Sequence, residues 1–322
     1  MVDPNGPLPP AQVETLHGAT VVPMAEDPDQ ACGVLRADGS FCETSATRLS
    51  AGRMTGIPQP PTNASPLPGR HLYAGLGRHH FGHFLVETIT RLWALDHQAV
   101  PYDGIVVIPK HGIDFNAVMR RRLGAFFDLL SGGLPVHVAD TPLKVETLCV
   151  PTQGFGHMNW LTGTPEFRNH TRQRLTAQIT PEGPEKLYVA RTALKDAAQA
   201  MDQEDRVVTM MKRAGYTVFH PQDHSLAEQC SRYMAARQIV GPDGSAFHLA
   251  PFVLQKGTRV GLIQRRHRQD VFDALVAQIR AFCEAELVTV NPLLPLGQGR
   301  EPDKPQVFVR QARRGLRDSG FL

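Results

Sequence analysis

The chain has 322 residues, a formal net charge of +3 at pH 7, and 42% hydrophobic against 20% charged residues. These values are typical of a soluble globular protein with room for two domains. The mildly basic charge forms no long run, so it suits an anionic small ligand or polymer and gives no indication of nucleic-acid binding. No apolar stretch approaches the roughly 18 residues that span a bilayer, and the first residues lack the pattern of a secretory signal.

The cysteines favour a reducing compartment. They are odd in number, scattered, and without the CxxC spacing of a zinc site or the regular spacing of a disulfide framework. The five are Cys32, Cys42, Cys149, Cys230 and Cys283. We therefore expect a cytoplasmic protein, with peripheral association at the inner face of the membrane as a further option.

The first half of the chain begins irregularly and then alternates between strand and helix. The first 70 residues are rich in proline and glycine, and they predict only short strands at 19–22 and 33–36. From residue 71 the apolar runs lengthen, and 104–109 is apolar throughout, as in a buried parallel sheet. The further predicted strands are 71–77, 136–138 and 147–151, with a helix at 79–97 and an amphipathic stretch at 116–130.

A second alternating series follows the proline break at 181–184. Its predicted strands are 186–191, 216–219, 238–241, 259–263 and 287–290, and its helices are 203–214, 225–236 and 270–284, with a short one after 245. Two such series predict an α/β fold of two Rossmann-like, doubly wound domains that face each other across a cleft. The domains expected are 1–180 and 181–322, the second ending in a polar arm from Pro292.

The predicted helix 79–97 carries ionisable residues at helical spacing within an apolar stretch. His83 and Glu87 are four residues apart and share one face, as do Glu87 and Arg91. Such groups are seldom buried without partners. Because the helix follows a predicted strand, they lie where open α/β sheets bind ligands. Read as metal ligands instead, His79, His80, His83 and Glu87 suit a zinc or iron hydrolase, although no second ligand cluster stands out.

These residues, in this order, resemble glycosyltransferase family 61. That family has an aromatic-His-x-x-x-Glu helix, a later strand ending in Arg, a Glu-Gln pair, and a Gly-Pro-His-Gly loop. The resemblance covers roughly residues 70–265. The matching positions are His80–Glu87, Arg91, Arg191, Glu204, Glu228 with Gln229, and 240–246.

The resemblance implies an inverting transferase of the two-domain GT-B type, of the kind found in bacterial capsule or exopolysaccharide synthesis. It would move a sugar from a nucleotide-diphosphate donor, expected to be a UDP-sugar, to an oligosaccharide or polysaccharide acceptor without an obligatory metal. The first domain would bind the acceptor and the second the donor. His83 is the first choice for the base, since an imidazole titrates near working pH, with Glu87 orienting its ring. The reverse assignment, or a purely structural pair, stays open.

The resemblance also implies a donor site. Arg191 would bind the diphosphate, and the loop of Asp243, Gly244 and Ser245 would contribute amide donors at a helix start. Glu228 either binds the donor or caps its helix with Ser225 in a capping box.

Four further residues are candidates of lower rank, namely His80, Arg91, Glu204 and Trp160. Glu204 would bind substrate or cap its helix, Arg91 would pair with Glu87 or pack along the helix, and Trp160 would stack on a sugar or base. Several family positions are altered: His80 stands for the usual Asn, Asp243 for His, Leu249 for Asn and Gly261 for an acidic residue. The family's second Arg has no clear match in 195–198. A catalytically inactive relative that binds nucleotide or saccharide is therefore the main alternative.

Overall fold

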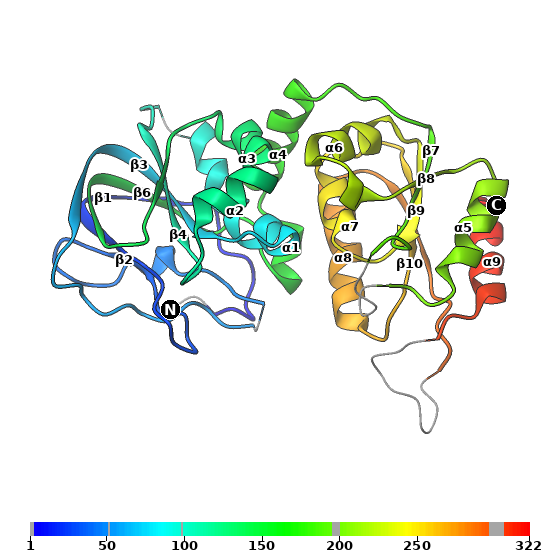
Figure 1. The fold of residues 1–322 in the computed structure, drawn as a ribbon, viewed down its shortest axis with the longest axis horizontal. Coiled ribbons are helices and arrows are strands. Elements are labelled where there is room, and N and C mark those ends of the chain that lie inside the picture. Colours follow the sequence, from blue (N-terminus) through cyan, green and yellow to red (C-terminus); the bar gives the residue numbers. More distant parts are fainter. Residues whose placement is uncertain (1–2, 51, 98, 195–199, 296–305) are drawn as a thin grey trace. The chain divides into compact units, whose positions relative to one another are not determined.

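The computed structural model describes residues 3–50, 52–97, 99–194, 200–295 and 306–322. The chain divides into two compact units, Met1–Leu175 and Thr176–Leu322. Each unit contains one β-sheet with helices packed against it, so the fold is mixed α/β (Figure 1).

Unit 1 is built on a six-stranded mixed sheet. Its order is β2-β1-β6-β3-β4-β5, in which β3, β4, β5 and β6 run parallel and β1 and β2 form an antiparallel edge. The strands are β1 (Val13–Val22), β2 (Gly33–Leu35), β3 (Ser65–Gly77), β4 (Gly104–Pro109), β5 (Val136–Val138) and β6 (Leu143–Pro151). The strands predicted at 19–22 and 33–36 are present, but the first is part of the longer β1. A fully parallel sheet is wrong for this unit, because β1 pairs antiparallel with β6 and β2 pairs antiparallel with β1, so no crossover helix is needed.

In the sheet, β3 lies between two strands that follow it in the chain, β4 and β6. The segment after β3 leads to β4 on one side, whereas β6 lies on the other side of β3. β3 and β6 are parallel neighbours, so the segments that follow them both begin at the carboxyl edge of the sheet, the place where α/β sheets bind ligands.

The N-terminal segment, residues 23–57, covers part of this sheet. Cys32, Cys42 and Leu49 pack in one buried cluster with Tyr73 of β3 and Val106 of β4. This packing explains how a segment with little regular structure of its own is held in place.

The predicted helix 79–97 is helical but not a regular α-helix. It starts as one turn, α1 (Phe81–His83), continues as a π-helical turn, η2 (Phe84–Thr88), and ends as a 3₁₀ helix, η3 (Ile89–Asp96). Phe84 anchors it by packing edge-on against Phe126. π turns occur often at functional sites.

Two helices replace the predicted amphipathic stretch at 116–130. They are α2 (Phe115–Arg122) and α3 (Gly124–Ser131), which meet at Leu123. A further helix, α4 (Pro165–Gln178), was not predicted. Its sequence is polar, and only four of its side chains are buried, so its apolar periodicity is weak.

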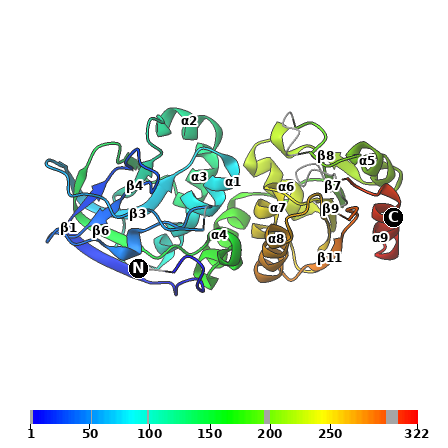
Figure 2. The same ribbon diagram turned by 90° about the horizontal axis from the view of Figure 1, so that it is seen from below.

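Unit 2 contains a five-stranded parallel sheet of order β11-β10-β9-β7-β8. Its strands are β7 (Lys186–Val189), β8 (Thr217–Phe219), β9 (Gln238–Pro242), β10 (Arg259–Ile263) and β11 (Glu286–Val290). This order is doubly wound, with the switch between β7 and β9. The helices are α5 (Glu204–Arg213), α6 (Leu226–Ala235), α7 (Ala246–Leu249), α8 (Gln269–Phe282) and α9 (Val309–Asp318). Figures 1 and 2 show α5 and α9 on one side of the sheet and α6, α7 and α8 on the other.

The tail ends in a helix and not only in an irregular arm. Ala312 and Leu316 of α9 are fully buried, four residues apart, in a cluster shared with Val207 of α5 and Val290 of β11. The intervening arginines make the segment polar on average and hid this narrow apolar face. No helix in the described part of the chain is long and apolar enough to cross a membrane.

Candidate functional site

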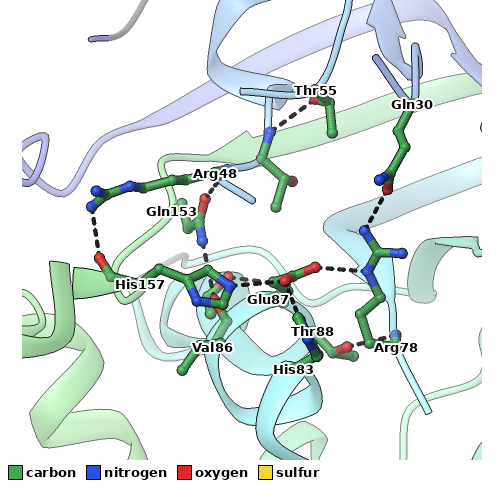
Figure 3. Close-up of polar contacts among 12 residues, drawn as sticks. Gln30, Arg48, Thr55, Arg78, His83, Val86, Glu87, Thr88, Gln153 and His157 are labelled. Carbon is green, nitrogen blue, oxygen red and sulfur yellow. Dashed lines mark hydrogen bonds and ion pairs between the residues drawn. The ribbon is translucent and has the colours of Figure 1, made fainter. Parts of the chain in front are cut away.

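A buried carboxylate lies at the carboxyl edge of the unit 1 sheet. Glu87, with 1% of its side chain exposed, accepts hydrogen bonds at Oε1 from His83 Nδ1 (2.6 Å) and His157 Nε2 (2.8 Å). Its other oxygen, Oε2, accepts from Nε of Arg78 at 2.7 Å. Figure 3 shows the three donors converging on this single carboxylate. The predicted proximity of His83 and Glu87 is confirmed.

The strand order explains how these residues meet. Arg78 directly follows β3, His83 and Glu87 belong to the helical segment after it, and His157 lies in the loop after β6. Because β3 and β6 are parallel neighbours, both segments begin at the same edge of the sheet. The site thus forms at the carboxyl ends of two parallel strands that are adjacent in the sheet but not consecutive in the chain.

The hydrogen-bond partners of Glu87 determine the protonation state of its carboxyl group. Burial alone would raise the pKa of Glu87, but the hydrogen bonds from His157 and His83 and the charge of Arg78 outweigh it and hold the pKa well below its usual range. Glu87 is therefore ionised, and each histidine must donate to it. This fixes one tautomer of each ring, with the proton of His83 on Nδ1.

The second ring nitrogen of His83, Nε2, takes no part in the hydrogen bond to Glu87. The side chain is 39% exposed and lines a cavity of about 400 Å³ together with Glu87, Arg78 and Lys110. With Nδ1–H held by a carboxylate, Nε2 carries the lone pair, the arrangement by which a carboxylate orients a histidine as a general base. A proton on an acceptor held in this cavity is therefore within the reach of a suitable base.

Arg78 and His157 were missed in the sequence. Arg78 follows the glycine turn that ends β3, and His157 lies in the loop singled out only for Trp160. Nη1 of Arg48 donates to the carbonyl of His157 at 2.6 Å, and the amide of Arg48 donates to Gln153 Oε1 at 2.9 Å (Figure 3). The N-terminal segment thereby fixes the loop that carries His157.

Two predicted site residues are structural. Arg91 does not pair with Glu87: it is fully buried, and it donates to Thr47 Oγ1 and to the carbonyls of Ala46 and Pro151. Trp160 is also fully buried, and its Nε1 donates to the carbonyl of Gly6. It offers no ring face to a sugar, so the stacking role is wrong.

His79 and His80 line the same cavity, and neither belongs to the group with the spacing of metal ligands. The ring of His80 stands edge-on to that of His83, with centroids 5.6 Å apart. His80 thus lies beside the candidate base.

A second cluster of charges lies at the carboxyl edge of the unit 2 sheet. Arg191 follows β7, Asp243 follows β9, and Arg265 and Arg266 follow β10. Asp243, 3% exposed, accepts the amide of Arg265 at Oδ1 (2.8 Å), and its Oδ2 lies 3.6 Å from Nε of both Arg265 and Arg266. No local pattern in the sequence marks these two arginines, and Asp243 is the carboxylate that orients them.

Arg191 fills the space beside Gly244. A Cβ atom at position 244 would lie 2.1 Å from Nη1 of Arg191, so this approach requires glycine. The amide of Arg191 donates to Oε1 of Glu204 at 2.9 Å. Burial lowers the pKa of Arg191 and lowers that of Arg265 to about 10.

The carboxylates leave this cluster positive. Burial raises the pKa of Glu204 despite its hydrogen bonds from Arg191 and Tyr188. Three guanidinium groups therefore face at most two negative charges, those of Asp243 and Glu204. Such a cluster suits a phosphate ligand.

The helix that was expected to contribute amide donors to the donor site, α7, is short. Gly244 and Ser245 lead into α7, which has only four residues, and the side chain of Ser245 makes no cap hydrogen bond. A single turn has a small dipole, so the positive potential here comes from the arginines.

Glu228 forms the predicted capping box. The Ser225 amide donates to Glu228 Oε2 at 2.8 Å, and the Glu228 amide donates to Ser225 Oγ at 3.2 Å. Its carboxylate is exposed at the surface. The capping role is thus present, and a role in donor binding stays a prediction.

Of the described residues, only His83, Glu87 and His157 form a group with the spacing of metal ligands. Two ligands at about 2.0–2.1 Å from a tetrahedral zinc lie roughly 3.3 Å apart. The distances of 2.6 and 2.8 Å to Glu87 are shorter and fit hydrogen bonds. Arg78 already supplies a cation to this carboxylate, and the absence of an obligatory metal stays a prediction.

A comparison with protein-family models finds one match. The model described as Glycosyltransferase 61 matches residues 81–261, more than half of the chain. The match includes His83, Glu87, His157 and Arg191, and it ends before Arg265. No curated protein matches the chain.

The lowered pKa of Glu87 makes a contribution to stability that depends on pH. A carboxyl whose folded pKa lies below its unfolded value, near 4.5, stabilises the fold above that value and loses this effect as the pH falls toward the folded pKa. Glu87→Gln should lower the free energy of unfolding by about 3–5 kcal/mol at neutral pH. The gap to wild type should shrink by up to about 1.4 kcal/mol per pH unit below the unfolded pKa.

Denaturant unfolding at neutral pH and at about pH 3 measures this gap. The exposed Glu185→Gln is the matched control and should change little. A gap for Glu87→Gln that is the same at both pH values would contradict the assignment of Glu87 as the ionised centre.

The hydrogen-bonded distances predict that unit 1 holds no metal. EDTA and added Zn²⁺ should leave the melting temperature of the purified chain unchanged, and elemental analysis should find no stoichiometric metal. Stabilisation by Zn²⁺ that disappears in His157→Ala would instead support a metal-dependent enzyme.

Proposed function

The chain belongs to glycosyltransferase family 61, and from this premise we propose that it is an inverting glycosyltransferase of polysaccharide biosynthesis. It transfers a sugar from a nucleotide-diphosphate donor to a saccharide acceptor. The observation that carries the proposal is the His83–Glu87 pair, hydrogen-bonded through Nδ1 of a histidine that lines a cavity of about 400 Å³.

His83 acts as the base in this proposal. Its Nε2 takes the proton of the acceptor hydroxyl while the hydroxyl oxygen attacks the anomeric carbon of the donor. The bond from that carbon to the diphosphate oxygen breaks, and its electron pair leaves with the diphosphate. Glu87 stabilises the imidazolium that forms, and the attack from the opposite face inverts the anomeric centre.

The arginine cluster of unit 2 receives the leaving diphosphate. Arg191, Arg265 and Arg266 supply positive charge and N–H donors without a metal, in a fixed arrangement held by Asp243 and Glu204. Residues 181–322 then bind the donor, proposed to be a UDP-sugar, and 1–180 bind the acceptor, as in enzymes of the GT-B type. We place the reaction in the cytoplasm, at the inner face of the membrane.

The alternative is an inactive relative that only binds nucleotide or saccharide. It is favoured by the residues that differ from the family pattern, above all Asp243, whose carboxylate is committed to Arg265 and is unavailable for proton transfer. An active enzyme turns over at least one sugar nucleotide. A chain that binds UDP but turns over none of a broad donor panel is the inactive relative.

His83→Ala should abolish turnover, because it removes the base, and should leave UDP affinity nearly unchanged. Initial rates of UDP release and calorimetric titration with UDP measure the two quantities. His17→Ala, an exposed histidine on β1, is the control and should behave as wild type. Wild-type rates in His83→Ala would overturn the assignment of the base.

Arg191→Ala, in contrast to His83→Ala, should act mainly on UDP affinity. Loss of a charged hydrogen bond to the diphosphate should weaken UDP binding by about 1.5–3 kcal/mol, roughly 10- to 150-fold. Arg237→Ala, whose guanidinium is exposed in the same unit, provides the comparison. Equal UDP affinity in both variants would place the diphosphate elsewhere.

A further inference from the structure

We propose that the cavity beside His83 receives an acceptor with an anionic group, a carboxylate or a phosphate, which Arg78 and Lys110 bind. This inference rests on the proposed function, because it specifies the acceptor of the same site.

The register of the sheet places the two cations side by side. Gly77 of β3 pairs with Pro109 of β4, and Arg78 and Lys110 are the next residues of these two parallel strands. Neighbouring strands are about 4.8 Å apart. Both side chains line the cavity. Adjacent like charges repel each other, so the pair is stabilised when an anion lies between them.

The cavity offers these cations no free carboxylate. Among its described lining residues Glu87 is the only acid, and both of its oxygens already accept hydrogen bonds. Arg53, the third permanent cation, pairs with the exposed Asp29 at 3.1 Å. Lys110 is exposed and makes no ion pair with any described residue. The lining therefore has an excess of positive charge.

Arg78 is held as a preformed donor. Its Nε donates to Glu87, and its Nη2 donates to Oε1 of Gln30 at 2.8 Å. Gln30 has a left-handed backbone (φ 49°), which is strained for a residue other than glycine and is found often at functional sites. Nη1 has no partner among the described residues, and Figure 3 shows it on the side of the guanidinium away from Glu87.

The anion belongs to the acceptor and not to the donor. Unit 2 already supplies three guanidinium groups for the diphosphate, as argued above. The cations of unit 1 are instead next to His83, the base that must contact the acceptor hydroxyl. A charged group on the acceptor would fix its orientation against Arg78 and Lys110 while the hydroxyl meets Nε2.

The test is a binding titration of the full chain saturated with UDP, followed by ligand-detected NMR. The probes are methyl β-D-glucuronide, D-glucose 6-phosphate and the neutral methyl β-D-glucoside. At least one charged sugar should bind about 10-fold or more tightly than the neutral one. Binding of the glucuronide alone identifies an acidic sugar as the source of the anion, and binding of the phosphate alone identifies a phosphorylated acceptor.

Substitutions of single lysines test whether the charged group of the sugar binds at Lys110. Lys110→Gln should reduce the affinity for the charged sugar by about 10-fold, and Lys110→Arg should retain it. Lys144→Gln, an exposed lysine at the amino edge of the same sheet, is the matched control. Equal binding of charged and neutral sugars, or no effect of Lys110→Gln, would overturn the proposal. So would weakened UDP binding in Lys110→Gln, because the cavity would then serve the donor. The titration requires no turnover and is read separately from the transferase assay.

Discussion

The buried carboxylate of Glu87 is the constraint on which the rest of unit 1 depends. An ionised carboxyl removed from water is costly unless every lone pair is matched by a donor. The donors come from three parts of the chain: the end of β3, the helical segment after it, and the loop after β6. The strand order and the fixed loop around His157 are therefore required for a carboxylate to remain charged at this depth.

The two units share one architectural rule although their sheets differ. In each, charged residues gather at the carboxyl ends of two parallel neighbours that are not consecutive in the chain, β3 and β6 in unit 1 and β7 and β9 in unit 2. The edge between such strands is open, because no connection crosses it. Unit 1 uses the opening for a histidine–carboxylate pair and unit 2 for arginines around Asp243. The division between proton transfer and charge stabilisation in the proposed function follows from this difference.

Local patterns in the sequence were sufficient for much of the fold. The strands of unit 2, its helices before α9 and the His83–Glu87 contact depend on periodicity within a few residues, and these were predicted. Arg78, His157 and Arg265 reach their sites through strand pairing, which no local pattern encodes. Arg91 was a candidate because it lies four residues from Glu87, and Trp160 because it lies in a loop, whereas here backbone carbonyls accept their hydrogen bonds inside the core. The narrow apolar face of α9 was hidden by its arginines.

The N-terminal segment that covers the unit 1 sheet lies wholly before the region shared with the family. It supplies Gln30 and Arg53 to the wall of the cavity, yet none of the atoms proposed to react. The same segment also fixes the loop of His157 through Arg48 and provides the oxygens of Ala46 and Thr47 that bind the buried Arg91. A change of acceptor is therefore expected to come from single substitutions at the cavity wall, whereas loss of the whole segment would also disturb the partners of Glu87.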